Sequence, residues 1–296
     1  MRFSYPKRIL LTMIIMLATS MLVMAALWMP PIKRHVKIMD AMFVIDITDS
    51  MNVVDAGLNG NPVSRETWAR DFVRRTLLKM PCGSHAGLAV FTQSRSLILI
   101  NPVEVCSSYH ALNQILNQVT PYMAWQRSSQ VSRGVYSAIR QAKDIEPQPS
   151  IVFITDGHEA SPLDEGLLPR FDGKPGQVKG LLVGVGGDKL LPIPKTNDKG
   201  KIEGFWGANE VVQTKQHTEQ LSSQKRAHLR NLAERVGFDY VSSPIQPSKL
   251  LDTLSKQAKT RPQVIDYDLY SWFAGLAMVL FLLVYLPYGR LMRLHN

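Results

Sequence analysis

The sequence predicts an α/β fold: a doubly wound, mostly parallel six-stranded sheet with helices on both faces, and a transmembrane helix at each end of the chain. Short apolar runs, such as SIVFIT at residues 150–155, alternate with amphipathic stretches through the middle of the chain. Uninterrupted apolar strands between helices are typical of a parallel sheet that is covered on both faces. Two long uncharged segments lie outside this pattern, one near each terminus.

The uncharged segments predict membrane spans at residues 9–28 and 271–288. The first has 20 residues, and as a helix it would extend about 30 Å, the thickness of a bilayer core. A cleaved signal peptide is the alternative for the first segment, and a buried core helix for the second. We therefore divide the chain into an N-terminal anchor at residues 1–37, a main domain at residues 38–262 and a C-terminal transmembrane segment at residues 263–296.

The net charge of +10 does not indicate a nucleic-acid partner, because most of it flanks the first apolar segment. Residues 1–37 carry six lysines and arginines and no acidic residue, and anionic lipid headgroups attract such charge. Arg290 and Arg293 follow the second segment, which favours a cytoplasmic C-terminus. Two spans then place the main domain in the periplasm of a Gram-negative bacterium, anchored in the inner membrane.

Apolar periodicity and helix caps predict the elements of the main domain. Ser64 is a typical N-cap before a helix, and Gly237 is the residue type expected just after one. Residues 187–224 are polar and rich in Gly, Pro and Lys, so we expect an insertion with little regular structure. The other expected elements, in order, are a strand at 42–47, a helix at 64–80, a hairpin with strands at 86–92 and 96–101, helices at 111–119 and 131–143, strands at 150–155 and 178–185, a helix at 229–236, a strand at 238–242 and a helix at 248–259.

The hairpin supplies an antiparallel third strand to a sheet of predicted order 3-2-1-4-5-6. The two cysteines of the chain, Cys82 and Cys106, flank this hairpin. A turn near Ser94 places them opposite each other just beyond the paired strands, where they meet the requirements of a disulfide. A disulfide indicates an oxidising compartment, in agreement with the periplasm. Two unrelated buried thiols are the alternative.

Short oxygen-bearing side chains follow two strands that are neighbours in this order. Asp46, Thr48 and Ser50 alternate at the end of the first strand, and Asp156 follows the fourth. Ligands of doubly wound sheets bind outside the carboxyl ends of these strands, and a loop that carries Ser129 forms a third wall. Two carboxylates and three hydroxyls suit Mg²⁺, with Mn²⁺ or Ca²⁺ as alternatives. Because hydroxyl ligands are neutral, the bound ion would attract a further carboxylate, which we expect on an acidic residue of a protein partner.

This pattern resembles the metal-ion-dependent adhesion site (MIDAS) of von Willebrand factor A (vWA) domains. The family pattern is DxSxS, then a Thr, then an Asp within T-D-G. The resemblance implies that the hydroxyls of Thr48 and Ser50 bind the metal directly and that Asp46 and Asp156 act mostly through water. Ser129 would engage the metal when the site is open. Thr48 and Ser129 replace the family's Ser and Thr, and each keeps an oxygen in place.

The vWA resemblance covers about residues 38–260. Two spans around such a domain resemble membrane-anchored aerotolerance-operon proteins. The arrangement resembles more closely the vWA accessory proteins that are encoded with periplasmic methanol dehydrogenase and thought to assist the insertion of its calcium. The resemblance implies methanol dehydrogenase, other vWA proteins or a MoxR-type AAA ATPase as partners.

We predict a non-enzymatic interaction module that assists the assembly of an exported enzyme in methanol oxidation. A metal-dependent phosphohydrolase in the same crevice is the alternative enzyme, although Thr48 stands where its second aspartate is needed. An aerotolerance-type scaffold and a purely structural domain with an empty site are further alternatives. His158 and Glu159 follow Asp156, and we expect them in a solvated loop. Ser129 has no neighbouring His and Asp pattern that would indicate a nucleophile.

Overall fold

The computed structural model describes residues 5–58, 60–124, 128–163, 167–197, 201–214, 217–257, 261–267 and 269–284. The chain divides into two compact units. The larger unit, Lys37–Gln263, is called the central domain below, and the smaller unit consists of Met1–Val36 and Val264–Asn296.

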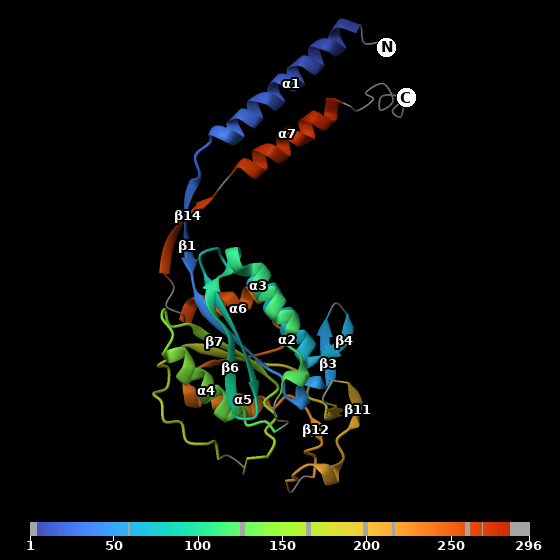
Figure 1. Ribbon diagram of the computed structural model, residues 1–296, viewed down its shortest axis with the longest axis vertical. Helices are drawn as coiled ribbons and strands as arrows, with labels where there is room; N and C mark the ends of the chain where they lie inside the picture. The colour runs from blue at the N-terminus through green and yellow to red at the C-terminus, as the bar shows by residue number, and fades with distance from the viewer. Residues whose placement is uncertain are drawn as a thin grey trace. The chain divides into compact units, whose positions relative to one another are not determined.

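The central domain is built on a six-stranded sheet in the order β13-β8-β7-β2-β5-β6 (Figure 1). All neighbouring strands are parallel except β5 and β6, so the predicted order and the antiparallel edge strand are confirmed. Each strand lies within three residues of its predicted bounds. In sheet order the strands span Asp239–Ser242, Gly180–Gly184, Ser150–Thr155, Asp40–Asp46, His85–Thr92 and Arg95–Glu104.

Helices cover both faces of the sheet because its central strands are apolar on both sides. In β2, Phe43 and Ile45 belong to one buried cluster, while Met42 and Val44 belong to the other, as the two-residue period of a strand requires. The first cluster packs beneath α2, α3 and α6, and the second beneath α4 and α5. In that order the helices span Arg65–Leu77, Val105–Gln118, Pro247–Gln257, Val131–Lys143 and Arg226–Val236.

Local signals set the helix ends that matter for the site. Ser64 caps α2, since its hydroxyl accepts from the backbone N of Thr67 at 3.1 Å. Gly237 ends α5 at a φ of 76°, and a Cβ there would lie 2.3 Å from the backbone N of Gly176. Only α3 departs strongly from its expected start, because it begins at Val105 directly after β6.

The insertion contains more regular structure than predicted, so the expectation of a mostly irregular segment is wrong. β9 (Leu191–Pro192) pairs with β12 (Leu221–Ser222), and β10 (Pro194–Thr196) pairs with β11 (Ile202–Phe205). A 3₁₀ turn follows at Ala208–Glu210. β9 and β12 pair over a long stretch of chain, whereas β10 and β11 form a local hairpin, and all four strands are too short to have a periodicity of their own.

A second hairpin also escaped the sequence prediction. It consists of β3 (Val54–Leu58) and β4 (Asn61–Ser64), which lead into α2. A further two-stranded sheet pairs β1 (Ile32–Ile38) with β14 (Arg261–Tyr267).

The smaller unit contains two apolar helices that contact each other, α1 (Tyr5–Trp28) and α7 (Tyr270–Val284). Among the described residues, only Ile9–Trp28 is long and apolar enough to cross a membrane. The 15-residue α7 is apolar but shorter, so the predicted span at 271–288 is not confirmed, and its last residues lie outside the described part of the chain.

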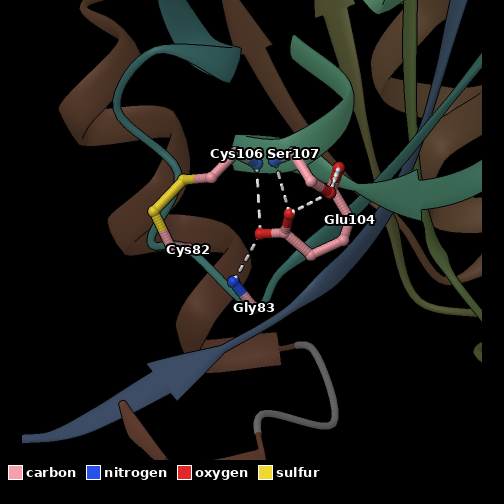
Figure 2. The surroundings of a disulfide bond; sticks show 5 residues. All are labelled: Cys82, Gly83, Glu104, Cys106 and Ser107. Atoms are coloured by element: carbon pink, nitrogen blue, oxygen red, sulfur yellow. Dashed lines mark hydrogen bonds between the residues drawn. A yellow bond between two sulfur atoms is a disulfide. The ribbon is translucent and has the colours of Figure 1, made fainter. Parts of the chain in front are cut away.

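A disulfide joins Cys82 and Cys106, whose Cα atoms are 5.3 Å apart (Figure 2). Cys82 precedes β5, and Cys106 lies in the first turn of α3. The crosslink therefore closes the open end of the β5–β6 hairpin and fixes the start of the following helix.

Glu104 caps α3 beside the disulfide (Figure 2). Its carboxylate accepts from the backbone N of Gly83, Cys106 and Ser107 at 2.7, 3.1 and 2.6 Å, and from the Ser107 hydroxyl at 2.6 Å. Partial burial favours the neutral acid, but these hydrogen bonds outweigh it and lower the pKa of Glu104 to about 2. The cap thus joins both sides of the crosslink through one side chain.

Replacement of Cys82 and Cys106 by serine should lower the free energy of unfolding. The disulfide closes a loop of 24 positions, for which the loss is about 3 kcal/mol. Urea titration of the full chain in detergent, followed by circular dichroism, measures it. Wild-type protein kept in reductant should match the double variant. An unchanged midpoint in both samples would contradict a structural role for the crosslink.

The Glu104→Gln variant should be less stable than wild type at pH 7. Because the folded pKa of about 2 lies below the ordinary 4.5, the carboxylate stabilises the fold above pH 4.5 and loses this effect as the pH falls toward 2. The difference in urea midpoint between wild type and variant should therefore shrink from pH 7 to pH 3. Glu146→Gln, at an exposed position, is the control and should show no such pH-dependent difference.

Candidate functional site

The structure brings the predicted metal ligands together at the carboxyl ends of β2 and β7. Asp46 ends β2, Thr48 and Ser50 lie in the turn that follows, and Asp156 comes directly after β7. These two strands are parallel neighbours, which is why residues more than 100 positions apart meet. All four side chains are buried, with exposed fractions of 3 % or less.

The Asp46 carboxylate organises the turn after β2. Its Oδ1 accepts from the backbone N and from the Oγ1 of Thr48, at 2.9 and 2.7 Å. Its Oδ2 accepts from the Thr155 hydroxyl at 2.6 Å, which ties β2 to β7. The Thr48 hydroxyl lies 3.5 Å from that of Ser50. Asp46 thus holds the Thr48 hydroxyl in place beside that of Ser50.

Asp156 has two differently occupied oxygens. Its Oδ1 accepts from the Ser50 hydroxyl at 3.1 Å and from the backbone N of His158 at 2.9 Å. Its Oδ2 accepts from Nη1 of Arg65 at 2.5 Å and from the hydroxyl of Ser222 at 3.1 Å. One oxygen of Asp156 therefore faces the hydroxyls of Thr48 and Ser50, called the hydroxyl layer below, and the other faces the buried guanidinium of Arg65.

Arg65 is the site residue that the sequence prediction missed. Its side chain is fully buried, and its Nε and Nη2 donate to both oxygens of Asp55 at 2.8 and 2.7 Å. Such a two-pronged pair is strong and fixes the guanidinium plane. In the sequence, Arg65 reads as an ordinary first residue of an amphipathic helix. Its partner Asp156 lies 91 positions away, so no local pattern indicates its burial.

The two buried carboxylates have different protonation behaviour. Burial, together with the negative charge of Asp156, raises the pKa of Asp46 to about 7. Burial acts in the same direction on Asp156, but the Arg65 guanidinium overcomes it and lowers the pKa of that carboxyl. No described Lys, Arg or His side chain forms an ion pair with Asp46. The site is therefore short of positive charge on its Asp46 side.

A hollow of about 200 Å³ opens over the hydroxyl layer. Thr48, Ser50 and Ser129 all line it, so the structure brings the three hydroxyl-bearing residues to one hollow. The backbone of Ser129 pairs with that of Ala160 through two hydrogen bonds of 2.7 Å. Its Oγ is buried and has no hydrogen-bond partner among the described residues.

The Ser129 loop is also tied to the turn of the β5–β6 hairpin. Ser129 and Gln93 form an isolated parallel bridge, and the backbone N of Gln130 donates to the carbonyl of Gln93 at 2.5 Å. The wall of the hollow is thus held by backbone contacts on both sides.

Two further residues line the hollow against expectation. His158 and Glu159 are only 3 % and 9 % exposed, so the prediction of a solvated loop is wrong. Burial lowers the pKa of the His158 imidazole, which keeps it neutral at pH 7. Glu159 is held by Ser132, whose backbone N and hydroxyl donate to its Oε1 at 2.9 and 2.7 Å.

The insertion supplies the opposite side of the hollow. Ile193, Trp206, Val211 and Glu210 all line it. The indole Nε1 of Trp206 donates to Oδ2 of Asp49 at 3.1 Å, which fixes the insertion on the turn after β2. The sequence prediction described this segment only as an insertion with little regular structure.

An α/β domain with its oxygen-rich hollow at the switch point between β2 and β7 is the architecture expected of a vWA domain. Residues 41–158 match the family model of the von Willebrand factor type A domain. The chain therefore contains a vWA domain, and all five predicted ligands lie within the matched residues.

Two solved structures share the fold. Conserved hypothetical protein BatB from Bacteroides thetaiotaomicron has 16 % identity and a TM-score of 0.51, with 74 % of this chain and 96 % of that chain covered. An aerotolerance-related membrane protein from Bacteroides fragilis NCTC 9343 has 19 % identity and a TM-score of 0.50, with 74 % and 98 % covered. The central domain is thus Bat-like in fold. No curated protein matches the sequence.

Substitution of Arg65 by methionine should destabilise the central domain strongly. It leaves the Asp55 and Asp156 carboxylates without their cation, and breaking a buried pair costs about 3 to 5 kcal/mol. Urea titration measures the loss. Arg75→Met is the matched control on the same helix, because Arg75 forms an exposed pair with Asp71 and should change stability by less than about 1 kcal/mol. Equal effects of the two substitutions would contradict the role assigned to Arg65.

Proposed function

We propose that this protein is a membrane-anchored interaction module that binds an acidic residue of a partner protein through a divalent cation in the hollow. The observation that carries the proposal is the meeting of three hydroxyls, from Thr48, Ser50 and Ser129, over two buried carboxylates. Hydroxyls lie toward the hollow, while Asp46 and Asp156 lie behind them.

The donor set fits a hard cation such as Mg²⁺, with Mn²⁺ and Ca²⁺ as alternatives. The hydroxyls of Thr48, Ser50 and Ser129 would hold the ion directly, and the unpartnered Oγ of Ser129 would gain a partner. Asp46 and Asp156 would balance its charge from behind. When bound, the ion supplies an uncompensated positive charge that attracts an incoming carboxylate. Arg65 pairs with Asp156 and not with Asp46, so a cation near Asp46 would also relieve the repulsion between these two acids.

The side chains around the hollow support binding rather than hydrolysis. Ser132 and His228 both contact Oε1 of Glu159, at 2.7 and 3.1 Å, so the serine proton points to the carboxylate and not to the imidazole. A nucleophilic serine would instead donate to its base. Thr48 stands where a phosphohydrolase would need an acidic residue. Turnover of a generic phosphoester by the purified protein, lost in Asp46→Asn, would favour the enzyme instead.

Two features support a place at the inner membrane of a Gram-negative bacterium. The helix Ile9–Trp28 has the length and composition of a membrane anchor. The Cys82–Cys106 disulfide suits an oxidising compartment, so we assign the central domain to the periplasm.

The cellular role that follows is assistance to an exported enzyme. Methanol dehydrogenase and its calcium insertion are one candidate. An aerotolerance-type scaffold is the other, and the similarity in fold to the aerotolerance-related membrane protein of Bacteroides fragilis favours it. Other vWA proteins are candidate partners in either role, whereas a cytoplasmic MoxR-type AAA ATPase would meet a periplasmic domain only indirectly.

Metal binding should depend on Ser50 and on pH. Ser50→Ala should weaken Mn²⁺ binding about tenfold or more, measured by calorimetry on the full chain in detergent. Below pH 7 the proton on Asp46 competes with the metal, since burial raises the pKa of this acid to about 7, so wild-type affinity should rise from pH 6 to pH 8. Ser255→Ala, on α6, is the control. Identical Mn²⁺ affinities for Ser50→Ala and wild type would contradict the site.

Partner capture should require the same metal site. In pull-downs from detergent extract with Mg²⁺ present, wild type should retain a partner that Ser50→Ala and wild type with chelator both lose. Ser255→Ala should behave as wild type does. Retention of the same proteins under every condition would refute binding through the metal.

A further inference from the structure

The hollow contains buried polar atoms that a metal-bound carboxylate does not use. Nδ1 of His158 and Oε2 of Glu159 are buried and have no hydrogen-bond partner within the described ranges. Both residues line the same hollow as Ser129. A buried polar atom without a partner costs free energy, so a ligand that supplies one is favoured.

Glu159 is fixed in place on one side only. Its Oε1 accepts from Ser132 and contacts Nε2 of His228, whereas its Oε2 is buried and has no hydrogen-bond partner among the described residues. A carboxylate oxygen is an acceptor, so the group that completes it must donate a proton, and a cationic donor forms the stronger bond.

The negative charge of the hollow also favours a cationic donor. Four carboxylates line it, from Asp49, Glu159, Glu210 and Glu219, and its described lining contains no Lys or Arg. Lys195 pairs with Glu210 at 2.5 Å, but no described Lys or Arg forms an ion pair with Glu159 or Glu219. An acidic ligand alone would gain from the metal and be opposed by these carboxylates, whereas a neighbouring positive charge would be attracted by them.

The insertion provides space for the stem of a long basic side chain. Ile193, Trp206, Val211 and Val212 give the hollow an apolar wall. Lysine and arginine lay their methylene stems along such surfaces while the charged head reaches a polar group.

We propose that the hollow has two subsites: the metal for an acidic side chain, and a cationic subsite at Glu159 for a lysine or arginine close to that acid in the partner. This inference rests on the proposed function and specifies the partner segment that it recognises. The cationic subsite consists of His158 and Glu159 on one side and the apolar wall of the insertion on the other.

The test compares peptides with the full chain in detergent, loaded with Mn²⁺. The probes are acetyl-Lys-Gly-Asp-Gly-Lys-amide, the same peptide with norleucine in place of both lysines, and the lysine peptide with asparagine in place of aspartate. Lysine on both sides of the aspartate makes the test independent of chain direction. Affinities come from the paramagnetic relaxation of peptide protons by Mn²⁺.

The lysine peptide should bind wild type about tenfold more tightly than the norleucine peptide, the worth of one hydrogen bond to a charged group. In Glu159→Gln this preference should fall below about twofold, since a neutral amide replaces the charged acceptor. The amide can keep the contact with Ser132, Mn²⁺ should still bind, and the affinity for the norleucine peptide should not fall, because the lost carboxylate only repels its aspartate. Glu146→Gln, before β7 and so at the other end of that strand, should keep the full preference.

The possible failures are distinguishable. Equal affinity of the lysine and norleucine peptides for wild type overturns the cationic subsite and leaves the metal function standing, even if Glu159→Gln does not fold. A preference that survives in folded Glu159→Gln also overturns it. A second equivalent of Mn²⁺ that disappears in Glu159→Gln assigns the subsite to a metal ion and overturns it too. Equal binding of the asparagine and aspartate peptides contradicts the proposed function itself.

Discussion

The buried guanidinium of Arg65 is the contact on which the site depends. It compensates Asp55 and Asp156, and its Nη1 also donates to the hydroxyl of Ser222 at 2.7 Å. Three segments far apart in the chain thus meet at one cation: the start of α2, the end of β7 and the insertion. Because Arg65 occupies one oxygen of Asp156, the other oxygen is left for Ser50. The hydroxyl layer is therefore organised by the protein's own charges.

The insertion adds a wall to the hollow that lies beyond the residues matched by the vWA family model. The strands and their oxygen-bearing ends are what the vWA family model matches, and that match ends at residue 158. Beyond it, Trp206 holds the insertion on Asp49, and Lys195 lies over the Trp206 ring at 4.7 Å while it pairs with Glu210. The apolar wall of the hollow and two of its acidic residues, Glu210 and Glu219, thus lie outside the match.

The sequence predicted the fold well because its signals are local. The apolar run of β7 (Ser150–Thr155) and the periodicity of α4 (Val131–Lys143) have the bounds that the pattern predicts. The predicted strand order alone placed Asp46, Thr48 and Ser50 close to Asp156, because β2 and β7 are parallel neighbours. What escaped depends on distant partners. Examples are the burial of Arg65, the two-residue strands of the insertion, and the burial of His158 and Glu159 beneath it. The early start of α3 was missed for another reason, since its cap is a glutamate, which is less usual there than Ser, Thr, Asp or Asn.

The bridge between Ser129 and Gln93 links the hollow to an edge of the sheet that is covalently closed. Gln93 occupies the turn of the β5–β6 hairpin, and the Cys82–Cys106 crosslink holds the opposite end of that hairpin. A displacement of Ser129 toward or away from a ligand would therefore bend the β5–β6 hairpin, whose opposite end is fixed by the disulfide. The backbone at Ser129 and Gln130 is thus restrained through the hairpin, and a wall that is restrained before a ligand arrives costs little affinity in rearrangement.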